Sequence, residues 1–170
     1  MRRSQLIGKH GETIARSTLS GLGIEIFGKI ETPKELHRVP HADRVVFEVH
    51  YTGKASSDFC GALPNGQAVF AEVKTKTGTE DRLCWSDFKS HQINNLQRYS
   101  GMNILALVVW VNEPRVYVMR WPIEDFAPGR SIALPEAAAH HDNTVAHIHK
   151  LLAQIDRQMS QMVMGGVGWR

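Results

Sequence analysis

The stretch from Ser56 to Lys76, SSDFCGALPNGQAVFAEVKTK, contains an aspartate, a turn and an alternating Glu-x-Lys, in that order. Residues 68–73 are small, β-branched or aromatic, which predicts a buried strand. This strand ends in Glu72 and Lys74, which share one face roughly 6.6 Å apart, with Val73 on the other face. Charged side chains are rarely buried without a partner or a purpose. The pattern therefore predicts a functional site at the end of this strand.

The loop before this strand decides whether its two acidic residues meet. A two-residue loop, Asn65-Gly66, would place Asp58 opposite Val73 and facing away from Glu72. A three-residue loop that includes the preceding proline forms a type I turn with a left-handed glycine, and it places Asp58 opposite Glu72. Opposed carboxylates repel unless a cation lies between them. Hard oxygen ligands beside a lysine favour Mg²⁺ over zinc.

Five parts of the chain form a pattern together. In chain order they are Glu12 in GKHGETI, Pro33 in TPKEL, Ser56-Ser57-Asp58-Phe59 with Gly61, Glu72-Val73-Lys74, and His91-Gln92-Ile93. Together they resemble the RecU-type Holliday junction resolvases of the PD-(D/E)XK nuclease superfamily, whose pattern is an Asp followed, a dozen or so residues later, by Glu-x-Lys. The likeness extends from about Gly8 to about Trp121, which is most of the chain.

This resemblance implies both a fold and an activity. The fold would be α/β and restriction-endonuclease-like, with a mixed central sheet flanked by helices. The activity would be metal-dependent endonuclease cleavage of four-way (Holliday) junction DNA by paired symmetric nicks, which leave 5′-phosphate and 3′-hydroxyl ends. Mg²⁺ is the implied cofactor, and Mn²⁺ is expected to substitute for it. Since two opposed strands must be cut, a two-fold homodimer would present two equivalent sites.

The resemblance also implies roles for single residues. The implied catalytic set is Asp58, Glu72, Lys74, Gln92 and Glu12. Asp58, Glu72 and the Val73 carbonyl would hold the metal, with Glu12 outside them. Lys74 would orient the attacking water or stabilise the transition state, and Gln92 would align water or hold the phosphate. From the residues alone, Glu12 also fits an exposed helical glutamate and Gln92 a plain polar residue of a first helical turn.

The segment TPKELHRVPHAD is expected to project from the body of the protein. Pro33 and Pro40 favour an ordered but irregular conformation over a helix. In RecU-like enzymes the corresponding insertion, here about 31–55, forms a stalk that enters the junction centre, where Lys34, His37, Arg38, His41 and Arg44 would meet phosphates. A solvated loop is the alternative, because nearby acidic residues nearly balance these bases. The full set expected to bind DNA is Arg2, Arg3, Lys9, Lys29, Lys34, Arg38, Arg44, Lys76 and His91.

Composition bounds the class of protein. A chain of 170 residues fits one domain with a sizeable core. It contains no membrane-length apolar run and no signal-peptide pattern, so we expect a soluble, cytoplasmic protein without a membrane partner. The two cysteines, Cys60 and Cys84, are expected to be reduced. A net charge of +3 and a pI near 9.0 permit nucleic-acid binding without requiring it.

Periodicity predicts the remaining elements. Helices are expected over 4–22 and from His91, which Ser90 would cap, to Gly101; strands are expected over 24–30, 44–51, 104–111 and 115–121. Residues 77–83 are polar and predict a loop. Gly8 or Gly11 would allow close backbone approach in the first helix. Phe88, before the second helix, is a candidate hydrophobic staple.

A C-terminal helix is expected over about 143–164. Its apolar residues are spaced by three and four in turn: Val145, Ile148, Leu152, Ile155, Met159 and Met162. Two interpretations are open, namely packing on its own sheet and a dimer contact. The histidines His140, His141, His147 and His149 lack a cysteine or acid at a recognised zinc spacing. They are expected to be solvated or to lie at the helix N-terminus.

Some features depart from the RecU pattern. Ser57 occupies the place of the superfamily's proline, the N-terminal arm is shorter, and the C-terminal helix is additional. Two other functions therefore stay open. One is a different endonuclease of the superfamily that acts on forks, flaps or ends, and the other is a catalytically inactive DNA-binding scaffold. A globular protein with an accidental Glu-x-Lys is a third possibility.

Overall fold

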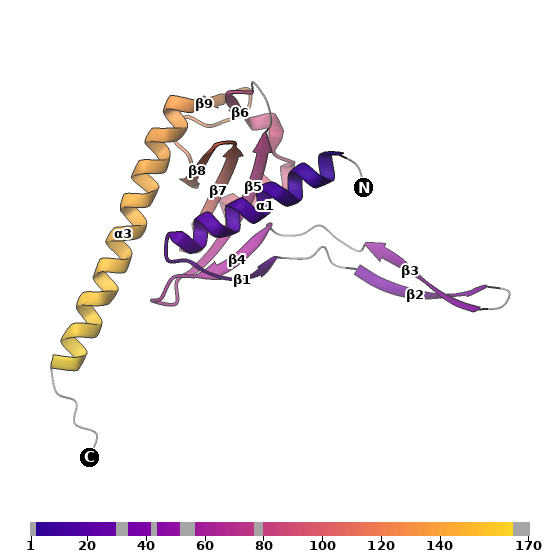
Figure 1. Cartoon of the computed structure of the whole chain (residues 1–170), viewed down its shortest axis with the longest axis horizontal. Helices are drawn as coiled ribbons and strands as arrows, with labels where there is room; N and C mark the ends of the chain where they lie inside the picture. The colour runs from indigo at the N-terminus through magenta and orange to yellow at the C-terminus, as the bar shows by residue number, and fades with distance from the viewer. Residues whose placement is uncertain (1–2, 30–33, 42–43, 52–56, 77–79, 165–170) are drawn as a thin grey trace, which may run out of the picture.

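The computed structural model describes residues 3–29, 34–41, 44–51, 57–76 and 80–164 (Figure 1). Its elements, in chain order, are α1 (Arg3–Gly21), β1 (Glu25–Lys29), β2 (Lys34–His41), β3 (Arg44–Tyr51), β4 (Phe59–Ala62), β5 (Ala68–Lys76), β6 (Arg82–Cys84), the 3₁₀ turn η1 (Trp85–Asp87), α2 (Ser90–Gly101), β7 (Leu105–Asn112), β8 (Arg115–Arg120), β9 (Ser131–Ala133) and α3 (Leu134–Met164).

The body of the protein is a mixed sheet of five strands in the order β1-β4-β5-β7-β8. Strands β5 and β7 run parallel, and the other neighbours are antiparallel. Residues of α1 pack into the core on one face of this sheet, and residues of α2 pack into the core on the other. The prediction of an α/β fold with a mixed central sheet flanked by helices is confirmed.

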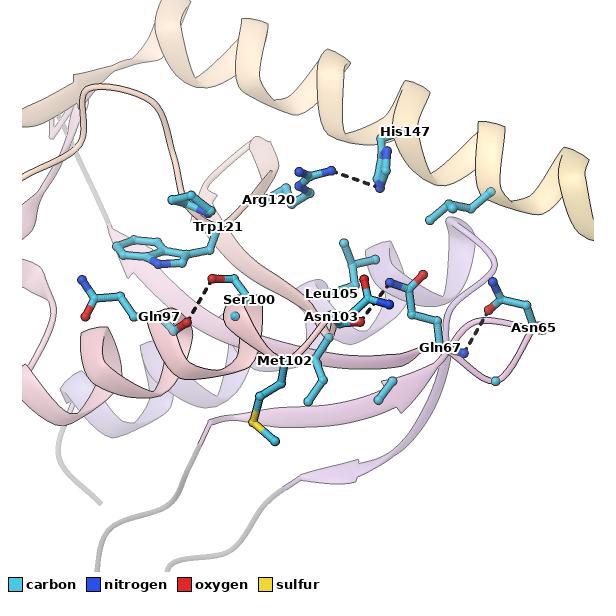
Figure 2. Close-up of a pocket in the computed structure, with 16 residues that line it drawn as sticks. Asn65, Gln67, Gln97, Ser100, Met102, Asn103, Leu105, Arg120, Trp121 and His147 are labelled. Carbon is cyan, nitrogen blue, oxygen red and sulfur yellow. Dashed lines mark hydrogen bonds between the residues drawn. The ribbon is translucent and has the colours of Figure 1, made fainter.

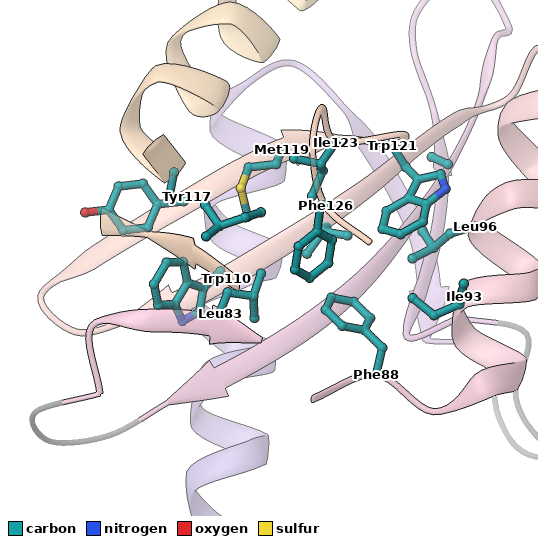
Figure 3. Packing of buried hydrophobic residues seen from close by; sticks show 14 residues of the cluster. Leu83, Phe88, Ile93, Leu96, Trp110, Tyr117, Met119, Trp121, Ile123 and Phe126 are labelled. Atoms are coloured by element: carbon teal, nitrogen blue, oxygen red, sulfur yellow. The ribbon is translucent and has the colours of Figure 1, made fainter. Parts of the chain in front are cut away.

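Strand β7 lies at the centre of the core, and all eight of its residues are buried. Successive residues divide between two hydrophobic clusters, because side chains alternate across a strand. Ala106, Val108 and Trp110 belong to the cluster that includes α2, shown in Figure 3. The intervening residues face the cluster that includes α1. A strand that is buried on both faces has no polar alternation, which is why its sequence is almost entirely apolar.

The hairpin between β4 and β5 has the predicted three-residue loop. Its register pairs Phe59 with Ala71. The Gly66 N–H donates to the Leu63 carbonyl at 2.8 Å, and Gly66 has a φ of 82°, the left-handed conformation that the predicted bulge requires. The ladder ends at Phe59, and the Asp58 N–H donates to the Ala71 carbonyl at 3.1 Å, so Asp58 lies just outside the paired strand. The predicted loop is confirmed, and so is the predicted register over residues 59–62 and 68–71.

Helix α1 crosses β5 at a glycine. A side chain at Gly11 would collide with the hydroxyl and methyl of Thr75, whereas a side chain at Gly8 would meet nothing. Gly11 is therefore the position where the helix and the strand approach closely, and Gly8 is not. Because Glu12 follows directly, this contact sets the height of Glu12 above the end of β5.

Within the segment expected to be irregular, residues 34–41 form a regular strand, so the expectation is wrong for them. Strands β2 and β3 form an antiparallel two-stranded ribbon that pairs Lys34 with Tyr51 and His41 with Arg44. Pro40 is tolerated because such a ribbon has a free edge on each side, where a missing N–H breaks no ladder hydrogen bond. Figure 1 shows the ribbon extending away from the five-stranded sheet.

Two helix boundaries differ from prediction. Helix α2 begins at Ser90, so Lys89 and not Ser90 occupies the N-cap. Helix α3 begins at Leu134 rather than near 143. Its second residue, Pro135, is compatible with a first helical turn, and the Glu136 carboxylate accepts the Ala133 N–H at 2.7 Å. The predicted loop over 77–83 ends earlier than expected, because β6 begins at residue 82; residues 77–79 lie outside the described part of the chain.

Helix α3 covers the outer edge of β8. The His141 imidazole accepts the Val118 N–H at 3.0 Å, and the Thr144 hydroxyl accepts the Arg120 N–H at 2.9 Å. These two bonds satisfy backbone donors that an edge strand would otherwise leave open. The expectation that His141 is solvated or lies at the helix N-terminus is wrong, because it is the eighth residue of α3 and its ring accepts a hydrogen bond from β8.

The apolar seam of α3 packs on the protein's own core over its first part. Ile148 is fully buried in the cluster that includes α1, and Leu152 packs against the same cluster. The interpretation of packing on its own sheet is confirmed there, whereas the side chains of Met159 and Met162 lie outside the described residues. Both cysteines are free thiols. Within the described ranges, no helix combines the length and apolarity needed to cross a membrane.

Candidate functional site

A cavity of about 400 Å³ lies at the end of β5. Its walls come from α1, the residue before β4, the second half of β5 and the first turn of α2. The residues that line it are Ile7, Gly8, Glu12, Asp58, Glu72, Val73, Lys74, Thr75 and Gln92. All five predicted catalytic residues are therefore in one place, although they come from parts of the chain that are far apart in sequence.

Asp58 is held by the backbone of β5. Strand β4 begins at Phe59, so beyond that residue β5 has no strand partner on this side. The Asp58 carboxylate takes the place of that partner and accepts the Val73 N–H at 2.8 Å. Because the N–H and C=O of one residue point to the same side of a strand, the Val73 carbonyl faces the same side as Asp58.

Glu72 is the most buried charged residue of the site, with 2% of its surface exposed. Its neighbours are the Lys74 ammonium, 3.2 Å away, and the Gln92 amide, which donates a short hydrogen bond to the same carboxylate oxygen. An isolated buried carboxylate would be very unfavourable, so these contacts are what allow Glu72 to stay in the core face of β5.

Burial raises the pKa of both carboxyl groups. For Asp58 the hydrogen bond from Val73 and the Lys74 charge oppose this effect, and the Glu12 charge adds to it. For Glu72 the pKa rises from 4.5 to about 7, first because the group is desolvated and second because Asp58 is negatively charged. The pair is short of positive charge even with Lys74 beside it.

Gln92 links the acidic and basic members of the site. Its carbonyl oxygen accepts from the Lys74 ammonium at 2.7 Å and from the Lys89 N–H at 2.9 Å, while its amide nitrogen donates to Glu72. It is the third residue of α2, so the predicted position in the first turn is confirmed. The amide side chain supplies an acceptor for the two N–H donors and a donor for the carboxylate, whereas a glutamate or a lysine here could not do both.

Glu12 reaches the cavity from α1. Its carboxylate pairs with the Lys29 ammonium at 2.6 Å, and both side chains are partly open to solvent. Glu12 is close enough to raise the pKa of Asp58 by its charge, in keeping with a position outside the central pair.

The oxygen atoms that line the cavity suit a hard cation, but only a few of the described side chains supply them. Within the part of the chain that the structure describes, no three His, Cys, Asp or Glu side chains come together as a metal cluster. Asp58, Glu72 and Val73 line the same cavity and together could offer two carboxylates and one backbone carbonyl. Such oxygen ligands match Mg²⁺, which keeps several waters and completes its coordination with substrate phosphate.

The basic residues predicted to bind DNA fall into three groups. Lys76 is engaged with Asp87 at 2.9 Å and Glu80 at 3.1 Å and is only 13% exposed, so its charge is already balanced. Lys9 is exposed on α1, His91 is partly buried in the first turn of α2, and Lys29 pairs with Glu12. Arg2 lies outside the described residues, as do the side chains of Arg3, Lys34, His37, Arg38, His41 and Arg44.

Phe88 contacts Lys74 from outside the cavity, and the sequence did not single it out for this purpose. The Lys74 ammonium lies over its ring, 4.6 Å from the centroid. The sequence did mark Phe88 as a helix staple, and it does belong to the same buried cluster as Ile93, one turn into α2. The pattern contains no signal that one face of this buried ring meets a lysine of β5.

A larger cavity of about 870 Å³ lies at the opposite end of β5 (Figure 2). No carboxylate is among its lining residues, which include Gln67, Asn103, Arg120 and His147. The Arg120 guanidinium lies 3.2 Å from the His147 ring. Burial, then the charges of Arg120 and Lys150, lower the pKa of His147.

No protein-family model matches the chain, and no curated protein is detectably similar to it. Among solved structures, it is similar to Hjc of Archaeoglobus fulgidus, a Holliday junction resolvase from an archaeal hyperthermophile, with 16% identity over 77% of this chain and 92% of that one and a TM-score of 0.44. It is also similar to a protein named SSO0001, with 16% identity over 90% of this chain and 61% of that one and a TM-score of 0.36. Both TM-scores are below 0.5 and both identities are 16%, so these similarities carry no argument about function.

Proposed function

We propose that the protein is a metal-dependent DNA endonuclease, formed by one nuclease domain, that resolves four-way junctions by paired symmetric nicks. The observation that carries the proposal is the convergence of Asp58 and Glu72 in one cavity, with the Lys74 ammonium fixed beside them by Gln92. Two carboxylates that are short of positive charge, next to a positioned ammonium, are suited to hydrolysis of a phosphodiester.

The chain's own residues divide the chemistry between them. Asp58, Glu72 and the Val73 carbonyl would hold Mg²⁺, or Mn²⁺ in its place. When bound, the ion lowers the pKa of a coordinated water and screens the charge of the phosphate. The Lys74 ammonium stabilises the additional negative charge of the transition state, and Gln92 holds that ammonium in place. The products would carry 5′-phosphate and 3′-hydroxyl ends.

The choice of substrate is supported by the shape and charge of the protein. The β2–β3 ribbon extends away from the sheet, as a stalk that enters a junction would, and the pI near 9.0 suits a polyanion (Figure 1). A homodimer would place two equivalent sites on opposed strands. Selectivity would then come mainly from junction shape and phosphate contacts, so binding should weaken steeply with salt.

The experiment is cleavage of an immobile four-way junction with Mg²⁺, beside linear duplex, fork and flap DNA, by wild type and Glu72→Gln. We expect paired nicks across the junction by wild type alone. Equal cutting of every substrate would retain the nuclease and reject junction selectivity, in favour of a different endonuclease of forks, flaps or ends. Tight binding without cutting under any divalent metal would favour an inactive scaffold.

A further inference from the structure

Phe88 lies beneath the lysine of the proposed nuclease site. The Lys74 ammonium is 4.6 Å from the centroid of the Phe88 ring, within the distance at which the negative face of an aromatic ring attracts a cation. The lysine side chain is only 13% exposed, so water screens this attraction weakly. Phe88 does not line the cavity itself, because it approaches the ammonium from the core side.

The ring is held rigidly from behind. Phe88 is 7% exposed and belongs to the aromatic cluster in Figure 3, with ring centroids 5.8 Å from Phe126 and 6.4 Å from Trp121. It also immediately precedes the N-cap of α2, the helix that carries Gln92. One anchored segment therefore sets the positions of both the ring and the glutamine that contact the lysine.

The Lys74 ammonium needs a fixed neighbour to hold it in one position. A lysine side chain has a flexible four-carbon stem and three N–H donors that rotate freely. Two acceptors come from Glu72 and Gln92, at 3.2 and 2.7 Å. The ring is the third neighbour. Unlike Glu72 and Gln92, it has no oxygen ligand for a metal and no N–H donor for a phosphate, and it is packed in the core, so neither ligand would displace it.

We propose that Phe88 is a positioning residue for Lys74, whose ring face holds the ammonium over the active site while Glu72 turns to other ligands. This inference rests on the proposed nuclease function. It predicts that weakening the ring's electrostatic face slows the chemical step and leaves substrate binding unchanged, because the ammonium acts on charge that develops in the transition state.

The test replaces Phe88 by phenylalanines that bear one, two and three ring fluorines, which weaken the negative face of the ring while nearly preserving its shape. We expect kcat for junction cleavage to fall stepwise with each fluorine, by roughly 10-fold in all, while KM and the unfolding temperature stay constant. The variant Phe88→Leu, which has no ring, should lose at least as much. A fluorine series with constant kcat would overturn the proposal.

Phe126→Leu is the matched control. It removes an aromatic neighbour of Phe88 from the same cluster but no contact with Lys74. We expect it to lower the unfolding temperature about as much as Phe88→Leu does, with kcat near that of wild type. Equal losses of kcat in both leucine variants would make Phe88 a packing residue only. If wild type itself cuts no DNA, the proposed function fails, which is a different result from a flat fluorine series.

Discussion

The two ends of β5 carry cavities of opposite kinds. The cavity at one end, of about 400 Å³, is lined by Asp58, Glu72 and Lys74. The cavity at the other end, of about 870 Å³, has no carboxylate in its lining. The larger cavity is the poorer candidate for hydrolysis by a bound metal, because it offers a histidine beside an arginine but no pair of carboxylates. The candidate active site is therefore the cavity with the charged side chains and not the cavity with the larger volume.

The difference arises from how the sheet ends on each side. At the hairpin end the backbone closes on itself, with the Leu63 N–H bonded to the Gln67 carbonyl. At the other end β4 stops first, and the next N–H of β5 bonds to the Asp58 carboxylate instead of a strand. Where a strand extends beyond the end of its neighbour, its backbone groups and side chains are free to bind a ligand.

The first prediction tests which cavity is the active site by removing one charged side chain from each. We expect Glu72→Gln to lower the cleavage rate by roughly 100-fold or more, since one of two converging carboxylates is lost. Arg120→Gln removes the cation of the larger cavity and should leave the rate within about two-fold of wild type. Rates on the four-way junction measure both. A large loss in Arg120→Gln would assign the larger cavity to the reaction.

The second prediction concerns stability without metal. Folding raises the pKa of Glu72 from 4.5 to about 7, so the folded protein binds more protons than the unfolded chain between those values. Stability should therefore fall as pH rises through this window, by on the order of 3 kcal/mol when complete. Denaturant unfolding at pH 5 and pH 8 in the presence of a chelator measures the difference.

Glu72→Gln provides the control for this pH dependence. In this variant the free energy of unfolding should decrease much less between pH 5 and pH 8. The variant should also be more stable than wild type at pH 8, because the buried charge and its repulsion from Asp58 are gone. Asp58→Asn should act in the same direction, since its amide oxygen can still accept the Val73 N–H. Identical pH profiles in wild type and Glu72→Gln would contradict the raised pKa.

The third prediction concerns the contact that positions Glu12. Gly11→Ala should destabilise the protein by about 1–3 kcal/mol, because the new methyl group would collide with Thr75. Thr75→Ala in the same chain should recover much of that loss. A double-mutant cycle of unfolding free energies checks it, and additive effects of the two changes would show that the close approach is absent. Gly8→Ala, where the space is open, is the matched control.

The smallest expected effect is at the outer edge of β8, where α3 covers the strand. Thr144 and Thr13 each donate to the carbonyl four residues earlier, but only Thr144 also accepts a strand N–H, that of Arg120. Thr144→Val should cost about 1–2 kcal/mol of stability, and Thr13→Val should cost about nothing. Thermal unfolding compares them. Cleavage by Thr144→Val should match wild type, because its hydroxyl closes the sheet edge and is remote from the acidic residues.

The parts of the fold that sequence predicted best depend on short-range rules. The hairpin loop and register followed from turn chemistry, and β7 from its apolar run. The start of α3 was placed too late, because its apolar seam becomes regular only after residue 143 and a proline lies in its first turn. Strands β6 and β9, three residues each, are too short to show a period.

Strand periodicity and the length of the hairpin loop were enough to predict that Asp58 and Glu72 meet, because these rules relate residues that are close along the chain. Helix-start signals likewise predicted Gln92 in a first helical turn. Three contacts had no such signal: the bridge from Gln92 to Glu72 and Lys74, the Phe88 ring under the ammonium, and the pairing of Lys76. These contacts join separate elements, and their geometry depends on how the sheet, α2 and the aromatic cluster pack, which no local pattern encodes.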